Sequence, residues 1–207
     1  MAEGEGGMIL SCKGISNGGR FTRKYTQDGQ GAVKDVSPPL EWYNVPEETV
    51  SLAIIMEDPD SPDPADPSPN PFVHWVVANI PPTMKGLPEG FAVKDVENED
   101  EEAGQILEGV NDFKSTGYRG PIPSPSEHRY EFRLYALDTK LKVPKKPSRE
   151  RLLEAMDGHI LEEAELVATY GMENSHLGHT APGVTRSGVA GRANTKSYNP
   201  MGQIHGR

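Results

Sequence analysis

Runs of apolar residues mark the predicted strands of this chain. VSLAIIMED at 50–58 and FVHWVVANI at 72–80 are continuous and rich in β-branched residues, as in strands buried on both faces. The shorter run MILSC at 8–12 also favours a strand. RYEFRLYALD at 129–138 alternates instead, which predicts a strand buried on one face only. Its inward and outward sets are Tyr130, Phe132 and Leu134, and Glu131, Arg133 and Tyr135.

One segment towards the C-terminal end has helical periodicity. Apolar residues recur there at spacings of 3, 4, 4 and 3, at Leu153, Met156, Ile160, Ala164 and Val167. Ser148 is suited to cap a helix, because its hydroxyl can accept a bond from one of the first free amides. Gly158 interrupts the pattern, and the LVATY that follows favours a strand. We therefore predict a helix over 148–162 and a final strand near 165–170.

The connections between these elements indicate the fold class. Long loops join the strands where helical crossovers would be needed for a doubly wound α/β fold, so a mainly β, antiparallel architecture is favoured. The 19 prolines and 22 glycines disfavour an all-helical chain. With 207 residues, the chain is long enough for one domain with a substantial core.

Charge is spread unevenly along the chain. The net charge is −10, but residues 171–207 carry four basic side chains and one acidic one, a net +3, which leaves −13 for residues 1–170. We predict a domain over 1–171 and a basic, glycine-rich tail over 172–207 that is disordered unless a partner binds it. The acidic body argues against nucleic-acid binding. Six carboxylates within 95–102 are interpreted as a solvated excursion.

Other features narrow the class of protein further. Cys12 is the only cysteine, which excludes an intramolecular disulfide and a multi-cysteine zinc site. The sequence MAEGEGG lacks the basic and apolar regions of a secretory signal, and no apolar run approaches the roughly 20 residues that span a bilayer. A cytoplasmic protein without stable membrane insertion is expected. HExxH and P-loop patterns are absent, and we expect neither a cofactor nor a metal.

Two aspartates and a histidine flank the proline-rich loop between the first two long strands. Antiparallel pairing of these strands would bring Asp58 and Asp60 up to the imidazole of His74. A nearby carboxylate favours the imidazolium, so His74 could hold an anion while the aspartates hold an ammonium or hydroxyl group. Taken alone, a histidine in VHWVV is more often a core residue, and Asp-Pro-Asp is turn chemistry.

A second candidate cluster is GYRGPIPSPSEHRY at 117–130. Gly117 and Gly120 allow close backbone approach, and their amides can point at an anion. Three prolines then stiffen the loop before a histidine and an arginine at the mouth of the next strand, namely Pro121, Pro123, Pro125, His128 and Arg129. Taken alone, this segment also fits a proline-rich hairpin connection with a surface His-Arg pair.

Together the two clusters resemble a known family. DPDSP…HWVVANIP followed by GYRGPIPSPSEHRYEFRLYALD strongly resembles the phosphatidylethanolamine-binding protein family, which includes the Raf kinase inhibitor proteins and the plant flowering regulators. SPPLEW, NDFKSTGYRGP and AMDGHILEEAELVATYG fit as well, and the resemblance covers residues 8–171, nearest to the compact bacterial and plant branch. It implies a large antiparallel sheet packed on a smaller one, peripheral helices, a small pocket at one end and a cis Ser61–Pro62 bond.

The resemblance also implies ligand-binding roles for particular positions. The residues that match the two halves of the family's anion pocket are Asp58, Asp60, Pro62 and His74, and Gly117, Gly120, Pro121, Pro123 and His128. The implied function is a non-enzymatic binding or regulatory module that takes phosphate or a phosphoethanolamine-like headgroup and contacts a protein partner such as a kinase. Two alternatives stay open. One is a structural subunit docked into a larger assembly through residues 172–207. The other is a hydrolase with Asp/His acid–base chemistry, although no serine or cysteine stands in a recognisable nucleophile elbow.

Overall fold

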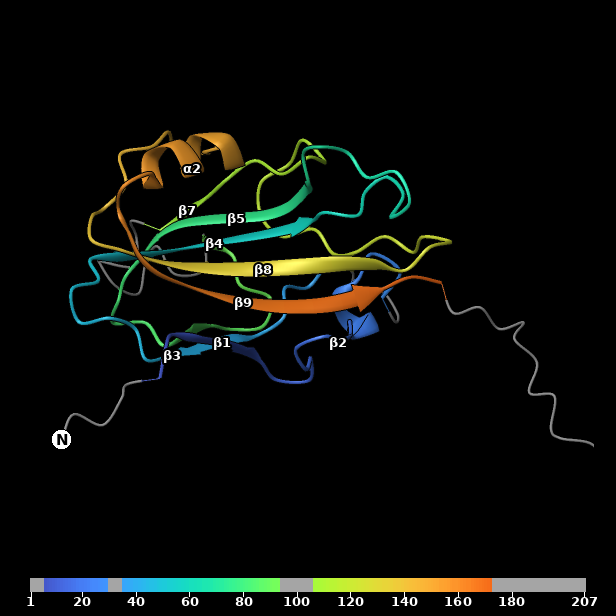
Figure 1. The fold of residues 1–207 in the computed structure, drawn as a ribbon, viewed down its shortest axis with the longest axis horizontal. Helices are drawn as coiled ribbons and strands as arrows, with labels where there is room; N and C mark the ends of the chain where they lie inside the picture. The colour runs from blue at the N-terminus through green and yellow to red at the C-terminus, as the bar shows by residue number, and fades with distance from the viewer. Residues whose placement is uncertain (1–5, 30–34, 94–105, 173–207) are drawn as a thin grey trace, which may run out of the picture. The chain divides into compact units, whose positions relative to one another are not determined.

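The computed structural model describes residues 6–29, 35–93 and 106–172, which form two β-sheets with peripheral helices (Figure 1). The large sheet has six strands in the order β2-β9-β8-β4-β5-β7, and the small sheet has three in the order β1-β3-β6. The large-sheet strands are β2 (Gly19–Arg20), β4 (Ser51–Asp58), β5 (Phe72–Ile80), β7 (Leu107–Glu108), β8 (His128–Leu137) and β9 (Ile160–Tyr170). The remaining elements are β1 (Ile9–Cys12), β3 (Leu40–Tyr43), β6 (Gly86–Leu87), the 3-10 helix η1 (Arg23–Tyr25) and α2 (Arg149–Met156).

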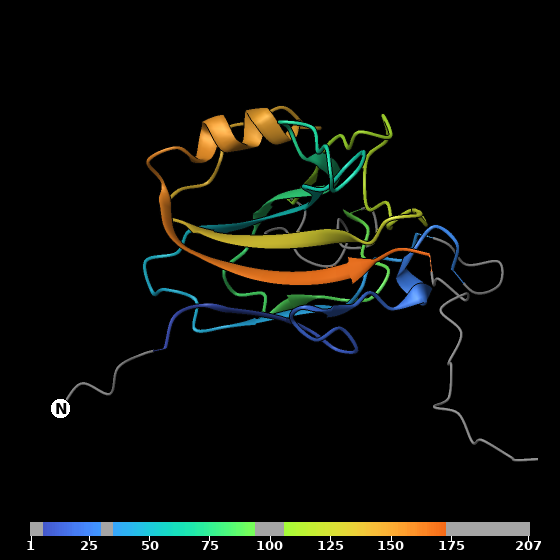
Figure 2. The same cartoon turned by 45° about the vertical axis from the view of Figure 1, so that its right-hand side comes forward.

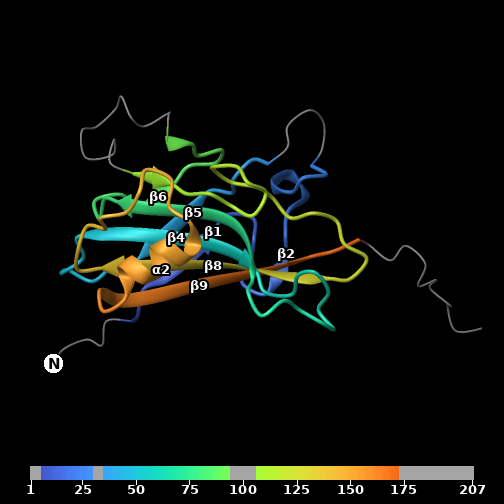
Figure 3. The same ribbon diagram turned by 90° about the horizontal axis from the view of Figure 1, so that it is seen from above.

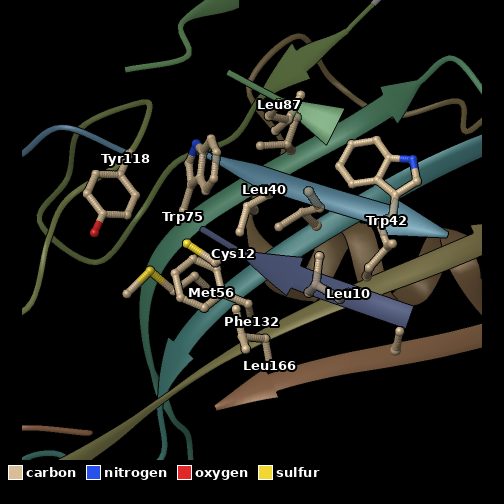
Figure 4. Packing of buried hydrophobic residues seen from close by; sticks show 14 of the residues in the cluster. Leu10, Cys12, Leu40, Trp42, Met56, Trp75, Leu87, Tyr118, Phe132 and Leu166 are labelled. Atoms are coloured by element: carbon tan, nitrogen blue, oxygen red, sulfur yellow. The ribbon is translucent and has the colours of Figure 1, made fainter. Parts of the chain in front are cut away.

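The predicted architecture of a large antiparallel sheet on a smaller one is confirmed. Neighbouring strands pair antiparallel throughout, except that β2 lies parallel to β9. The small sheet covers one face of the large sheet, and α2 lies on the opposite face (Figures 1 and 2). The main core lies between the two sheets, where apolar side chains from both interdigitate (Figure 4). Its members include Leu10, Leu40, Trp42, Met56, Trp75, Phe132 and Leu166.

A second apolar cluster lies on the opposite face of the large sheet, the face that α2 covers. Figure 3 shows α2 over the strands of this sheet. Leu152 and Met156 of α2 pack there with Ile55 of β4 and Val76 of β5. Because the large sheet is covered on both sides, every residue of β4 is buried, and so is every residue of β5 after Phe72. The prediction that the two continuous apolar runs are strands buried on both faces is therefore confirmed.

The prediction of a half-buried strand at 129–138 is wrong for part of that strand. Tyr135 is only 5% exposed and Glu131 only 8% exposed, although both belong to the outward set of the alternation. Tyr135 joins the cluster beneath α2. Glu131 pairs with Arg133 across 2.7 Å, which compensates the carboxylate for its lost hydration. The alternation identified the two faces of the strand, but it could not reveal that α2 and its connecting loops cover the second one.

The predicted helix is shorter, and the final strand longer, than the sequence indicated. α2 begins after Ser148, whose hydroxyl accepts a hydrogen bond from the Arg151 amide at 3.4 Å, as expected of a cap. It ends at Met156, because Gly158 adopts the left-handed region with φ +76° and redirects the chain into β9 at Ile160. The residues with helical spacing in the sequence therefore belong to two separate elements, α2 and β9.

A buried ion pair attaches α2 to the large sheet. The Arg149 Nε donates to the Glu57 Oε2 at 2.5 Å, and the Glu57 side chain is 6% exposed. A second ion pair on the same helix, Arg151 to Glu154 at 2.8 Å, is 67% and 70% exposed. The two pairs have the same chemistry and differ in burial, so they form a matched comparison.

We expect Glu57→Ala to lower the free energy of unfolding by about 2 kcal/mol, because it leaves the Arg149 guanidinium at a mostly buried position without its partner. Glu154→Ala should change it by no more than about 0.5 kcal/mol, since water screens the exposed pair. Urea unfolding of both variants measures the difference. Equal effects of the two substitutions would show that the buried pair does not hold the helix in place.

Candidate ligand pocket

A pocket of about 270 Å³ opens at the end of the large sheet where β4 ends and β5 and β8 begin, on the right in Figure 1. Its walls are formed by Asp58, Ser61, Pro62, Phe72, His74, Ile122, Pro123, Ser124, Pro125, His128 and Tyr130. The two sequence clusters thus meet in one site. Of the predicted site residues, Asp58, Pro62, His74, Pro123 and His128 line it. The described residues of its wall include no lysine or arginine.

A chain of hydrogen bonds runs from a buried carboxylate to the loop that borders the pocket. Asp58 lies 4% exposed at the end of β4, and its Oδ2 is 2.8 Å from the His128 Nδ1. The His128 Nε2 is in turn 3.2 Å from the Ser124 hydroxyl. Burial raises the pKa of Asp58, and the contact with His128 partly offsets that rise. An ionised Asp58 only accepts hydrogen bonds, so the His128 Nδ1 carries the hydrogen and the Nε2 faces Ser124.

The second aspartate supports the site from behind. The Asp60 carboxylate accepts from the Arg129 amide at 2.8 Å and from the Arg129 guanidinium at 3.0 and 2.8 Å. These bonds to Arg129 lower the pKa of Asp60. The Asp60 amide donates to the Asp58 Oδ1 at 2.9 Å, which fixes the orientation of that carboxylate. Asp60 does not line the pocket. It acts on the site indirectly, because its amide orients Asp58, which does line the pocket.

The prediction that Asp58 and Asp60 face the His74 imidazole is wrong. The His74 Nδ1 lies 2.8 Å from the carbonyl oxygen of Arg119, to which it donates. His74 is 2% exposed and packs at its ring edges against aromatic rings, and burial lowers its pKa to about 4. The ring is consequently neutral near pH 7. His74 lines the pocket, but it brings no positive charge to it.

The glycines of the second cluster serve the packing of the loop. Gly120 lies against backbone, and its amide donates to the Asp35 Oδ1 at 2.9 Å, so this amide is not free for an anion. Gly117 has φ +89° and lines a different hollow beside Glu108. The Pro121 carbonyl accepts from the Gln27 amide at 3.0 Å. None of these three predicted site residues, Gly117, Gly120 and Pro121, lines the candidate pocket.

Several pocket residues were missed in the sequence, although most of them stand inside the quoted motifs. Ser124 is the middle residue of PSP before His128, and only the distance to the imidazole makes it notable. Tyr130 belongs to the inward set of its strand, which could have identified it as a wall of the site. Phe72 packs edge-on against His74 with ring centroids 5.5 Å apart. Its position at the start of β5 was the available signal.

The remaining predictions concern the Ser61–Pro62 bond, the acidic segment, the tail, membrane-spanning helices and metal binding. The Ser61–Pro62 bond is cis, as the family resemblance implied. The acidic segment 95–102 and the predicted tail, except for Met172, lie outside the described residues. Across 6–29, 35–93 and 106–172, no helix is long and apolar enough to cross a membrane. Within the same residues, no group of three histidine, cysteine or carboxylate side chains is placed to hold a metal ion.

Comparison with known proteins agrees with this fold. The model of the phosphatidylethanolamine-binding protein family matches residues 12–171, and the chain belongs to this family. A UPF0098 protein of Methanothermobacter thermautotrophicus is 42% identical over 167 residues, covering 79% of this chain and 98% of that protein. The structure is similar to that of a putative phosphatidylethanolamine-binding protein homologue from Chlamydia trachomatis, with a TM-score of 0.68 and 36% identity over 81% of this chain and 99% of that one. Escherichia coli YbcL, at 28% identity, also gives a TM-score of 0.68, over 81% of this chain and 100% of that one.

Proposed function

We propose that this protein is a binding module whose pocket takes a phosphate group, either as free phosphate or as part of a phosphorylated headgroup, and that it acts by modulating a partner protein. The family name supports a phosphorylated ligand. The observation that carries the proposal is the His128 imidazole at the pocket wall, with the buried Asp58 carboxylate 2.8 Å behind it. In its protonated form an imidazole donates from both ring nitrogens, so the Nδ1 can bond to Asp58 while the Nε2 gives a charge-assisted hydrogen bond to an anion.

His128 is the group that holds the anion in this proposal. His74 is neutral near pH 7, and the described wall has no lysine or arginine. The Ser124 hydroxyl beside the His128 Nε2 is a second donor within reach of the same ligand oxygen atoms. The anion is thus bound by one histidine and neutral donors.

The amine end of a phosphoethanolamine ligand gains little from the aspartates. Asp58 already accepts from His128 and from the Asp60 amide, and Asp60 already accepts three bonds from Arg129. Both residues are also buried, at 4% and 8% exposed, so an ammonium group would have little access to either carboxylate. The phosphate group should therefore carry the affinity, and the rest of the headgroup should add little to it.

NMR-detected titrations with inorganic phosphate, phosphoethanolamine and ethanolamine test this proposal. We expect phosphate and phosphoethanolamine to bind with similar affinity and ethanolamine not to bind. His128→Ala should weaken phosphate binding at least about tenfold, because a charge-assisted hydrogen bond contributes roughly 1.5–3 kcal/mol. His74→Ala should weaken it less.

His159→Ala is the matched control, because the His159 Nδ1 also lies 2.8 Å from an aspartate, Asp138, but both side chains are nearly half exposed and outside the pocket. This variant should bind phosphate like the unmodified protein. If His128→Ala and His159→Ala bound phosphate equally well, or if phosphate left the spectrum unchanged, the pocket would not be a phosphate site.

A protein partner such as a kinase remains a prediction, as does cytoplasmic localisation. The rim of the pocket offers one contact for such a partner, since Ile122 lines the pocket and is 47% exposed. An apolar residue at this place can contact a bound protein while the ligand occupies the pocket beside it. Docking through residues 172–207, the alternative role, concerns residues outside the described part of the chain.

A further inference from the structure

We propose that Ser124 is an activated nucleophile, which accepts the acyl group of a small ester with His128 as its general base. The His128 Nε2 lies 3.2 Å from the Ser124 Oγ, and the His128 Nδ1 lies 2.8 Å from the Asp58 Oδ2. Nucleophile, base and orienting carboxylate are thus joined in sequence at the distances expected of such a site. Ser124 was not identified from the sequence, because it stands in a proline-rich loop without the usual elbow motif.

Further contacts hold Asp58, His128 and the loop of Ser124 in place. Asp58 and His128 are 4% and 5% exposed, so the pair is shielded from water. The Asp58 Oδ1 accepts the Asp60 amide at 2.9 Å, which leaves the Oδ2 directed at the imidazole. The Ser124 carbonyl accepts the Met172 amide at 2.8 Å, which ties the loop to the end of β9. Asp58 is a positioning residue here, since it acts through His128.

The pocket next to the serine suits a short acyl group. Pro62, Phe72, Ile122 and Pro123 provide an apolar wall, and the volume of about 270 Å³ admits only a small molecule. Tyr130 lines the same pocket, and burial raises the pKa of its phenol far above the ordinary value, so the hydroxyl keeps its proton. It can therefore donate to a developing oxyanion. His74 is the less suitable donor, because its one N–H in the neutral ring is used by the Arg119 carbonyl.

The proposed reaction with an ester and water balances in two halves. The Ser124 Oγ attacks the ester carbonyl carbon while its proton passes to the His128 Nε2. The carbon–alkoxy bond then breaks, and the leaving alkoxide takes this proton and departs as the alcohol. In the second half, water attacks the acyl-serine and gives a proton to His128, the bond to the Ser124 Oγ breaks, and the serine recovers the proton as the carboxylic acid leaves.

This proposal does not depend on phosphate binding, although both use His128. It adds a chemical step to the binding role proposed above, where the sequence led us to expect binding alone. A phosphate titration of Ser124→Ala separates the two proposals, because binding through His128 should persist in that variant while acylation is lost.

Incubation of the full chain with p-nitrophenyl acetate, followed by intact-mass measurement and peptide mapping, tests the nucleophile. We expect a burst of nitrophenol and one acetyl group located on Ser124. Ser124→Ala should lose this adduct, and His128→Gln should form it at least about 100-fold more slowly. Ser126→Ala is the matched control, since Ser126 lies two residues further along the same loop but does not line the pocket, and this variant should react at the unmodified rate. Because the adduct is located in the unmodified protein, the result does not rest on the folding of any variant.

Asp58→Asn tests the positioning residue, with the ¹⁵N shifts of the His128 ring as the readout. The unmodified protein should show the hydrogen on Nδ1, and the variant should show a change of tautomer together with a rate at least about 100-fold lower. A merely structural loss would lower the rate without moving the hydrogen between the ring nitrogens. No adduct in the unmodified protein, acetylation of lysines only, or an unchanged rate in Ser124→Ala would each overturn the proposal.

Discussion

Gly120→Ala is expected to lower the free energy of unfolding by at least about 3 kcal/mol. A Cβ at this position would lie 2.3 Å from the Tyr25 carbonyl oxygen and 2.8 Å from the Thr26 Cα. Both neighbours are backbone atoms, which cannot rotate away as a flexible side chain can. The Tyr25 carbonyl also accepts the Tyr118 hydroxyl at 2.7 Å, so moving it would strain a buried hydrogen bond.

Chemical denaturation monitored by circular dichroism measures this effect, and Gly6→Ala is the control. The nearest heavy atom to a Cβ at Gly6 is 3.9 Å away, an ordinary contact, so that substitution should change the stability by less than about 0.5 kcal/mol. If Gly120→Ala were as stable as Gly6→Ala, the loop would have space for a methyl group at residue 120, contrary to the structure.

The second large effect is a dependence of stability on pH that comes from His74. Burial lowers the pKa of His74 from 6.5 to about 4 in the folded protein. Between these two values, the unfolded chain binds the proton and the folded chain does not. The contribution of the neutral ring is thus complete above pH 6.5 and is lost as the pH falls towards 4. The shift corresponds to a loss of about 3 kcal/mol across this window.

His74→Asn isolates that contribution, because the asparagine amide can replace the Nδ1 donor to the Arg119 carbonyl without a titrating ring. We expect the unmodified protein to lose about 3 kcal/mol more than this variant between pH 7 and pH 4, measured by denaturation at a series of pH values. His159→Asn removes a half-exposed imidazole instead and should follow the unmodified protein. Parallel curves of stability against pH for all three proteins would mean that folding does not lower the pKa of His74.

The sequence patterns identified the correct residues, but some of the predicted contacts between these residues are wrong. Asp58 and the two histidines were all predicted for one site, and all three line one pocket. The carboxylate pairs with His128, seventy positions away in sequence, and not with His74 on the neighbouring strand. The strand pattern could not decide between them, because the answer depends on registers that contain irregularities between Leu52 and Ile54 and between Met56 and Glu57.

Gly117, Gly120 and Ser124 show the same limit in the proline-rich loop. A glycine in a motif indicates close approach, but the sequence does not say whether a ligand or another stretch of backbone comes close. At Gly120 the neighbour is the segment around Tyr25, more than ninety residues earlier. Ser124 was an ordinary loop serine in the sequence, and its distance of 3.2 Å from the His128 Nε2 is a property of the folded chain alone.

The sequence by itself determined the strands β4, β5 and β8, the antiparallel β-rich class, the cap at Ser148 and the two segments that form the pocket. These features depend on apolar patterns and turn residues, which act over a few neighbouring positions. Tertiary structure alone decided that α2 packs over Tyr135 on the second face of β8, that His74 is neutral and that Asp58 aligns His128 with Ser124. The reason is physical. Desolvation and side-chain pairing depend on which distant segments cover a group, and local sequence does not contain that information.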